Sequence, residues 1–182
     1  MTFSASVKEE LEGIISCKAL PDSRTCGDVC IWRGDKIWSR KETVITFFSR
    51  KRKCCKKVLY FIGKTFRISK VFSIGDVLYR KNNKYVVDIP GEDEAIRILQ
   101  AMKYLSQDRM PITFNGLVNP LIIQKNCCKR AFLRGAFLCA GSISDPEKFY
   151  HFEIVCTSSI KAEQLQETLH SFEVEAKTVS RK

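Results

Sequence analysis

Apolar residues recur along the chain with two different spacings, one typical of helices and the other of strands. Near the start, Val7, Leu11 and Ile14 fall on one helical face. Ser6 and Glu9 have the spacing of a capping box, so this stretch predicts a helix over residues 6–16. Helical spacing continues along the chain and predicts further helices over residues 49–66, 91–105, 131–140 and 158–172.

Short runs rich in β-branched and aromatic residues lie between these helices and predict strands. Residues 36–48 have the pattern of two strands around a polar turn. Residues 71–89 have that of a hairpin turning at Lys81–Lys84, where two asparagines suit the turn. Two more strands are predicted over residues 150–156 and 174–179. Helices that alternate with strand pairs in this way predict an α+β fold.

The order of helices and strands repeats once along the chain, which predicts two units of similar topology. Residues 1–20 form an N-terminal helix and connection, and residues 21–105 form the first repeat. A polar, proline-containing connection over residues 106–124 leads to a second repeat over residues 125–182, which we expect to lack a closing strand and helix. The two repeats are similar in element order and not in residues.

The charge of the chain favours polyanionic partners. Its 182 residues carry 31 Lys and Arg against 20 Asp and Glu, a formal net charge of +11, and we expect nucleic acid as the partner rather than lipid. No apolar stretch approaches the roughly 20 residues that a membrane span needs, and the first residues include acids where a signal peptide would be basic. We therefore expect a cytoplasmic, nucleoid-associated protein without a membrane partner.

The nine cysteines predict reduced thiols and no metal site. Their number is odd, and their spacing is not that of a disulfide framework. Cys26 and Cys30 have the only zinc-like spacing, but no second pair follows, and His151 and His170 are isolated from them. We expect no metal and no cofactor.

The stretch LRGAFLCAGSI, Leu133 to Ile143, resembles the helix of LAGLIDADG homing endonucleases. In that family a face of small residues lets two helices pack closely, and an acid near the helix end binds the catalytic metal. When Gly135 and Gly141 are aligned with the glycines of the motif, the acid position falls on Ala140. In the first repeat the same position falls on Trp32 or Arg33, depending on the register. Because Mg²⁺ needs oxygen ligands, the resemblance implies the scaffold without catalytic residues.

A resemblance over nearly the whole chain is to the WhiA family of bacterial DNA-binding regulators, which join a degenerate LAGLIDADG domain to a C-terminal helix-turn-helix domain. It rests on the stretches FSASVKEEL, LPDSR, CCKRAFLRGAFLCAGSISDPEKFYHFEIVC, KAEQLQ and SFEVEAK. It implies αββαββα-type repeats, of which the second is truncated here, and a non-catalytic role in transcription regulation during cell division, chromosome segregation and sporulation. The helix-turn-helix module lies outside this sequence. Other regulators are further expected partners.

The family fold implies that the sheet, rather than the helices, touches the DNA backbone. The expected phosphate-binding residues are therefore cations of the predicted strands and turns: Lys36, Arg40, Lys41, Arg80 and Lys84. The basic run from Arg50 to Lys57 is interpreted as a solvated helix face. Trp38, Tyr79 and Tyr85 are assigned to the sheet core rather than to groove contacts.

Three other functions compete with this interpretation. An active nuclease would need the motif carboxylates that are missing here. A protein-interaction or scaffold domain would leave DNA binding to the helix-turn-helix module. A basic RNA-binding protein would be expected to carry a stacking signature of the Lys/Arg-Gly-Phe type, which the sequence lacks.

Overall fold

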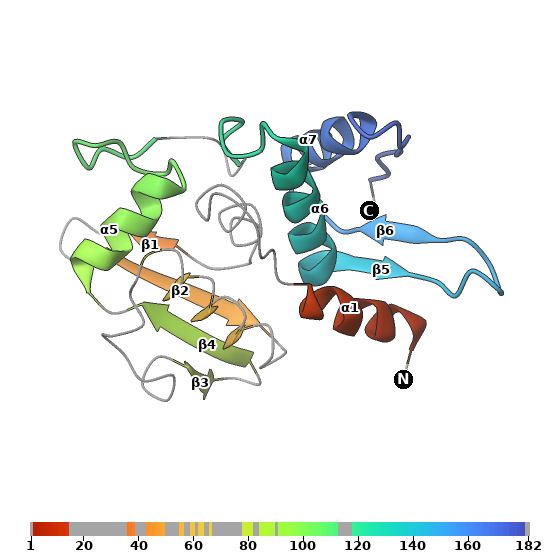
Figure 1. Cartoon of the computed structure of the whole chain (residues 1–182), viewed down its shortest axis with the longest axis horizontal. Helices are drawn as coiled ribbons and strands as arrows, with labels where there is room; N and C mark the ends of the chain where they lie inside the picture. The colour runs from red at the N-terminus through yellow and green to blue at the C-terminus, as the bar shows by residue number, and fades with distance from the viewer. Residues whose placement is uncertain are drawn as a thin grey trace.

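A four-stranded sheet and a mainly helical lobe lie side by side in the computed structural model of the chain (Figure 1). The structure describes residues 2–14, 36–38, 43–49, 55–56, 59–60, 62–63, 66, 78–81, 84–89, 91–112 and 118–180.

The first sheet contains β1 (Lys36–Trp38), β2 (Thr43–Ser49), β3 (Leu78–Lys81) and β4 (Lys84–Ile89). All neighbours are antiparallel, in the order β1-β2-β4-β3. The strand pair over residues 36–48 and the hairpin turning at Lys81–Lys84 are therefore confirmed. Paired residues of antiparallel strands share a face, so the pairs Ile45↔Ile89 and Leu78↔Val87 define one face of the sheet. All four of these residues are buried in the core.

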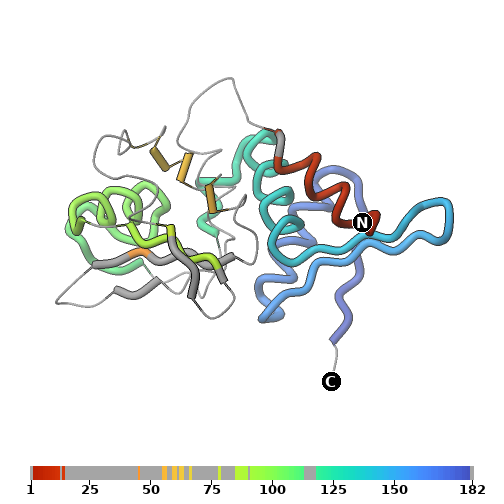
Figure 2. The backbone as a smooth tube through the Cα atoms, turned by 90° about the horizontal axis from the view of Figure 1, so that it is seen from below, coloured from red at the N-terminus to blue at the C-terminus, as the bar shows by residue number. Residues whose placement is uncertain are grey.

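Helix α5 (Glu92–Ala101) covers this face (Figure 2). Three acids in its first turn complement the helix dipole, and Ile98 and Leu99 pack into the core beside Ile45. Residues 55–56, 59–60, 62–63 and 66 are helical, as their apolar spacing predicts, and Cys55 and Ile62 are buried in the same core. Tyr85 packs against this core, as expected. The side chains of Trp38 and Tyr79 are not among those described.

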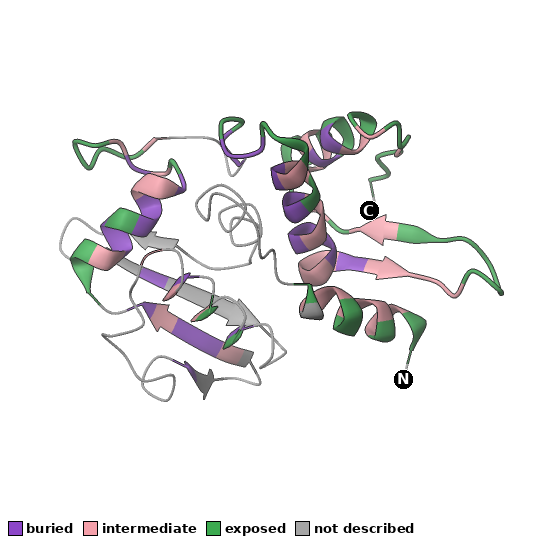
Figure 3. Ribbon diagram, viewed as in Figure 1, coloured by how far each residue is buried: buried purple, intermediate pink, exposed green. Residues whose placement is uncertain are grey.

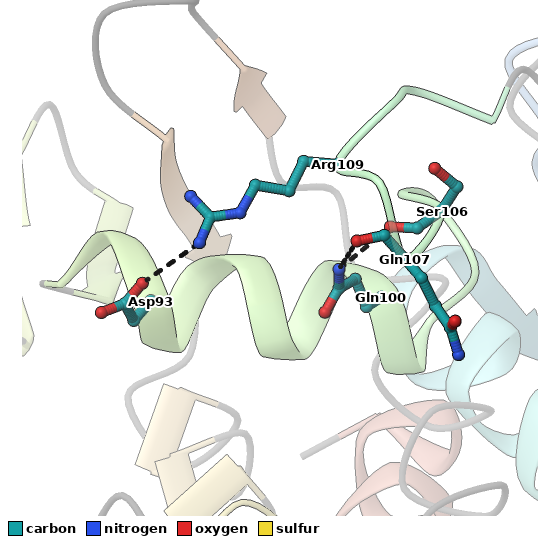
Figure 4. Close-up of polar contacts among 5 residues, drawn as sticks. All are labelled: Asp93, Gln100, Ser106, Gln107 and Arg109. Atoms are coloured by element: carbon teal, nitrogen blue, oxygen red, sulfur yellow. Dashed lines mark hydrogen bonds and ion pairs between the residues drawn. The ribbon is translucent and has the colours of Figure 1, made fainter.

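Helix α5 ends four residues before its predicted end at residue 105. Lys103 adopts a left-handed conformation with φ 58°, and the N–H of Tyr104 donates to the carbonyl of Leu99. This geometry closes the last turn. The chain then folds back along the helix (Figure 4): Gln100 Nε2 donates to the Ser106 and Gln107 carbonyls at 2.9 and 3.3 Å, and Arg109 lies 3.8 Å from the Asp93 carboxylate.

The second lobe contains three helices and a two-stranded antiparallel sheet among the described residues. Helix α1 (Phe3–Gly13) packs against helix α6 (Asn126–Ala140), and α6 leads directly into β5 (Gly141–Ile143). Strand β6 (Phe152–Ile154) pairs with β5, and helix α7 (Ser159–His170) follows. The predicted helices over residues 131–140 and 158–172 are confirmed.

Contacts of the Phe137 ring connect α1, α6 and β6. The ring of Phe137 in α6 stacks on Phe152 with centroids 5.4 Å apart and planes 8° apart. The Lys8 ammonium of α1 lies 5.4 Å from the Phe137 ring centroid, within the range of a cation–π interaction. The Ile143 N–H donates to the Ser4 hydroxyl at 3.3 Å, which ties α1 to β5 as well.

One hydrophobic core extends through both lobes. It includes Ile45 and Ile98 of the first lobe, and Phe132 and Leu165 of the second. The connection between the lobes adds Val118, Ile122 and Ile123 to this core. Gln164 of α7 clamps that connection, because its Nε2 donates to the Val118 carbonyl at 2.7 Å and its Oε1 accepts from the Val118 N–H at 3.0 Å.

The structure also corrects the start of the first helix and adds a short strand. Helix α1 begins at Phe3 rather than residue 6, because Thr2 is its N-cap and accepts from the Ala5 N–H. Strand β5 was not predicted; it is short and begins with a glycine.

The predicted strand over residues 174–179 is absent from the structure. This stretch is held against α7 instead: Gln166 Nε2 donates to the Ala176 carbonyl at 2.7 Å, and the Thr178 hydroxyl donates to Gln166 Oε1 at 3.3 Å. The stretch is therefore stabilised by the Gln166 side chain of α7 rather than by a β-ladder.

Candidate nucleic-acid interface

The β3–β4 hairpin gathers three cations at one end of the first sheet. Arg80 pairs with Tyr85, and Lys81 pairs with Lys84 next to the turn. Tyr85 lies in the same row of pairs as Val87 and Ile89 on the core side of the sheet. Lys81 and Lys84 lie in the alternate row, on the face opposite α5. The register therefore places two lysines on the face away from α5.

The predicted phosphate-binding residues do not all lie on this face. Lys36 pairs with Ile45, so its position belongs to the core-side row of the edge strand β1. Arg80 belongs to the same row at the opposite edge of the sheet, and Lys84 lies in the other row. Arg40 and Lys41 are outside the described residues. The five positions stay a prediction, and the register divides them between two faces.

The end of helix α6 carries no carboxylate at the position where the motif comparison expects one. Ala140 is the last residue of the helix and Gly141 is the first of β5. A Cβ at Gly141 would collide with the Phe137 ring and would lie 2.8 Å from Phe137 Cα, which is backbone. Only glycine therefore lets the chain leave α6 in this direction without displacing the helix.

Glu153 lies on β6, opposite the second residue after this helix end. Its carboxylate already contacts two other side chains. Glu153 pairs with Ser142 across β5 and β6, and the Ser142 hydroxyl donates to Glu153 Oε1 at 3.1 Å. His151 Nε2 lies 3.4 Å from Glu153 Oε2. The sequence did not reveal the contact of Ser142 with Glu153, because β5 was not predicted. The Glu153 carboxylate therefore lies between the Ser142 hydroxyl and the His151 imidazole. In a hydrolytic triad the histidine lies between the carboxylate and the serine, so this order differs.

No group of three or more His, Cys, Asp or Glu side chains that could hold a metal ion occurs within the part of the chain that the structure describes. Cys26 and Cys30 lie outside that part. Cys55, Cys127, Cys128, Cys139 and Cys156 are thiols rather than halves of disulfides. Burial raises the pKa of the Cys156 thiol, and the charge of Lys161 lowers it in part. A raised pKa keeps this thiol in its less nucleophilic form.

Comparison with known proteins identifies the family. The family model of the WhiA LAGLIDADG-like domain matches residues 129–182. The whole chain is 34% identical over 199 residues to a probable cell division protein WhiA of Lachnoclostridium phytofermentans, and 37% identical over 193 residues to one of Alkaliphilus metalliredigens. The chain belongs to the WhiA family. It spans 58% of the length of each of these two relatives.

Solved structures show the same fold. The chain superposes on the N-terminal LAGLIDADG domain of a DUF199/WhiA protein with a TM-score of 0.61 at 18% identity, covering 100% of this chain and 81% of that one. Full-length DUF199/WhiA from Thermatoga maritima gives a TM-score of 0.61 at 20% identity, over 97% of this chain and 53% of that one. The predicted α+β, LAGLIDADG-like fold is confirmed. None of the helices in the described ranges is long and apolar enough to cross a membrane.

Proposed function

We propose that this chain is a non-catalytic, DNA-binding part of a WhiA-type transcription regulator that acts in cell division, chromosome segregation and sporulation. The relatives are named as probable cell division proteins, which supports the cellular role. The observation that carries the DNA-binding part is the position of Lys81 and Lys84 on the sheet face opposite α5, in a chain with a net charge of +11. The polyanion expected on that face is the DNA backbone.

This binding is expected to be weak and to have little sequence preference. Phosphate contacts position a protein on DNA, whereas contacts to base edges provide specificity. Lysine is suited to phosphates, which it meets as a point charge rather than through a fixed bidentate geometry. The affinity is then expected in the non-specific range of about 10⁻⁴–10⁻⁶ M at physiological salt.

Fluorescence anisotropy with unrelated duplexes across a salt series tests this proposal. Binding should be similar for all duplexes and should weaken steeply as salt rises, because counterions are released from each neutralised phosphate. If no duplex is bound even at low salt, this chain does not bind DNA by itself, and the scaffold alternative replaces the proposal. Strong preference for one duplex would also contradict it.

We further expect no Mg²⁺-dependent DNA cleavage. The helix end that would carry the metal-binding acid has Ala140 and Gly141, and Glu153 is engaged with Ser142 and His151. Supercoiled plasmid incubated with the purified chain and Mg²⁺ or Mn²⁺ should stay intact. Nicking that disappears on Glu153→Gln would show instead that this carboxylate supports catalysis.

A further inference from the structure

Two adjacent thiols lie close together at the start of helix α6. Cys127 and Cys128 are the second and third residues of this helix, and their sulfur atoms are 3.9 Å apart. The helix passes from exposed to buried residues at this point (Figure 3). Cys127 is half-buried, whereas Cys128 is 1% exposed. The pair therefore combines a thiol near the surface with one that the protein encloses.

The helical backbone disfavours a disulfide between these two residues. Neighbouring Cα atoms are about 3.8 Å apart across a trans peptide, whereas disulfides usually join Cα atoms about 4.4–6.8 Å apart. The N–H groups of Cys128 and Lys129 donate to the Lys125 carbonyl at 2.8 and 2.9 Å, so the first turn of the helix is formed around the pair. Joining the sulfurs would strain this turn, and the two residues are therefore suited to act as separate thiols.

The same separation suits one ion bonded to both sulfurs. A zinc–thiolate bond is about 2.3 Å long, so two bonds of this length reach across up to about 4.6 Å when they are collinear. Sulfur atoms 3.9 Å apart are bridged by such bonds at a bent angle. The gap is thus wide enough for a metal ion between the sulfurs, and small side-chain rotations can adjust it.

The number of ligands selects a soft ion of low coordination number. Thiolates favour Cu(I), zinc and iron–sulfur clusters, but structural zinc sites and clusters usually need four protein ligands. Within the described ranges, no group of three or more His, Cys, Asp or Glu side chains could complete such a site. Two thiolates are sufficient to hold Cu(I), which is the soft ion that this pair fits best.

The charges near the pair favour the complex that this ion would form. Binding of Cu(I) removes one proton from each thiol and forms two copper–sulfur bonds, so the complex carries a single negative charge. It lies in the first turn of α6, at the positive end of the helix dipole, where anions are stabilised. This turn contains no acidic residue, and Lys125 and Lys129 flank the pair in the sequence.

We propose that Cys127 and Cys128 form a two-thiolate site for a soft monovalent cation, Cu(I), at the N-terminal end of α6. The site lies about 20 Å along the helix from Gly141, where β5 begins, and so away from the second sheet (Figure 1). It is also separate from the β3–β4 hairpin that carries the proposed DNA contacts, so either proposal can fail without the other.

Competition with bicinchoninate, a coloured chelator of Cu(I), tests the site in the whole chain without oxygen. The chain has nine cysteines, so the measured quantity is the number of Cu(I) ions that it withdraws from the chelator. Cys127→Ser should withdraw one ion fewer than the wild type, because loss of a ligand weakens this site by about a hundredfold or more. The matched control is Cys139→Ser, which replaces another half-buried cysteine of α6 and should withdraw the wild-type number.

Circular dichroism checks that both variants are folded. The proposal is overturned if the wild type withdraws no Cu(I), if Cys127→Ser withdraws as many ions as the wild type, or if the control also loses an ion.

Alkylation by iodoacetamide, followed by mass spectrometry of peptides, locates the ion and compares it with zinc. Buffered Cu(I) should slow the alkylation of Cys127 by about tenfold or more, because a metal-bound sulfur is a poorer nucleophile than a thiolate. Cys139 should react as it does without metal, and Zn(II) should protect neither residue. Protection of Cys127 by Zn(II) but not by Cu(I) would show that the choice of ion is wrong. Protection by Cu(I) only at other cysteines would show that the site is wrong.

Discussion

Replacing both Lys81 and Lys84 with alanine is expected to weaken the binding of DNA to the proposed interface. The affinity at low salt should fall by about tenfold or more. The pair lies in one register row of the β3–β4 hairpin, on the face opposite α5. If each lysine neutralises one phosphate, the slope of log affinity against log salt should fall by about 0.9 per lysine, and so by about 1.8 for the pair. Fluorescence anisotropy at several salt concentrations measures both quantities.

The matched control is the double replacement of Lys36 and Arg80, which removes the same charge from the core-side row of the same sheet. A smaller loss of affinity and a smaller change of slope are expected. Equal losses from the two variants would mean that net charge, rather than the sheet face, determines binding. A larger loss from the control would place the interface on the other row.

Replacing Phe132 with alanine is expected to lower the free energy of unfolding by about 3–5 kcal/mol, the usual cost of removing a buried phenylalanine ring. Phe132 is 3% exposed and lies in the core that both lobes share. Because small domains are stable by only about 5–15 kcal/mol, this variant should be largely unfolded at moderate denaturant concentrations. Urea denaturation followed by circular dichroism measures the change.

Phe149→Ala is the matched control, because it removes the same ring from a position that is 62% exposed at the tip of the β5–β6 hairpin. Exposed substitutions usually change stability by about 0.5 kcal/mol or less. If the two variants lose similar stability, the two lobes do not share a core around Phe132. If only Phe132→Ala lowers the free energy of unfolding, and both lobes unfold in one transition, the shared core is supported.

The elements that the sequence predicts well are those with a strong local signal. Helix α7 has apolar residues at helical spacing and Ser158 as its N-cap, and the β3–β4 hairpin has β-branched and aromatic strands around an Asn-Asn turn. The errors arise where two local signals compete or where one is missing. At the N-terminus, Thr2 and Ser6 are both plausible caps, and contacts of α1 with α6 and β5 accompany the longer helix.

The candidate site is predicted less completely than the fold. Net charge and the positions of cations are properties of the sequence, but the face on which a strand residue lies depends on register, and a shift of one residue moves it to the other face. Lys36 and Lys84 look equivalent in the sequence, and the pairing of β1 with β2 and β3 with β4 separates them. The contact of Ser142 with Glu153 likewise depends on the pairing of β5 with β6.

The sequence by itself determined the α+β class, the small-residue motif of α6 and the absence of a motif carboxylate at Ala140, because these depend on residue type and spacing along the chain. Only the tertiary structure decided that residues 174–179 lie against α7 rather than in a strand, and that residues 141–143 form a strand paired with β6. A strand needs a partner whose distance along the chain is not encoded in its own pattern. Local periodicity therefore predicts which residues can form a ladder, and packing of the whole chain decides which of them do.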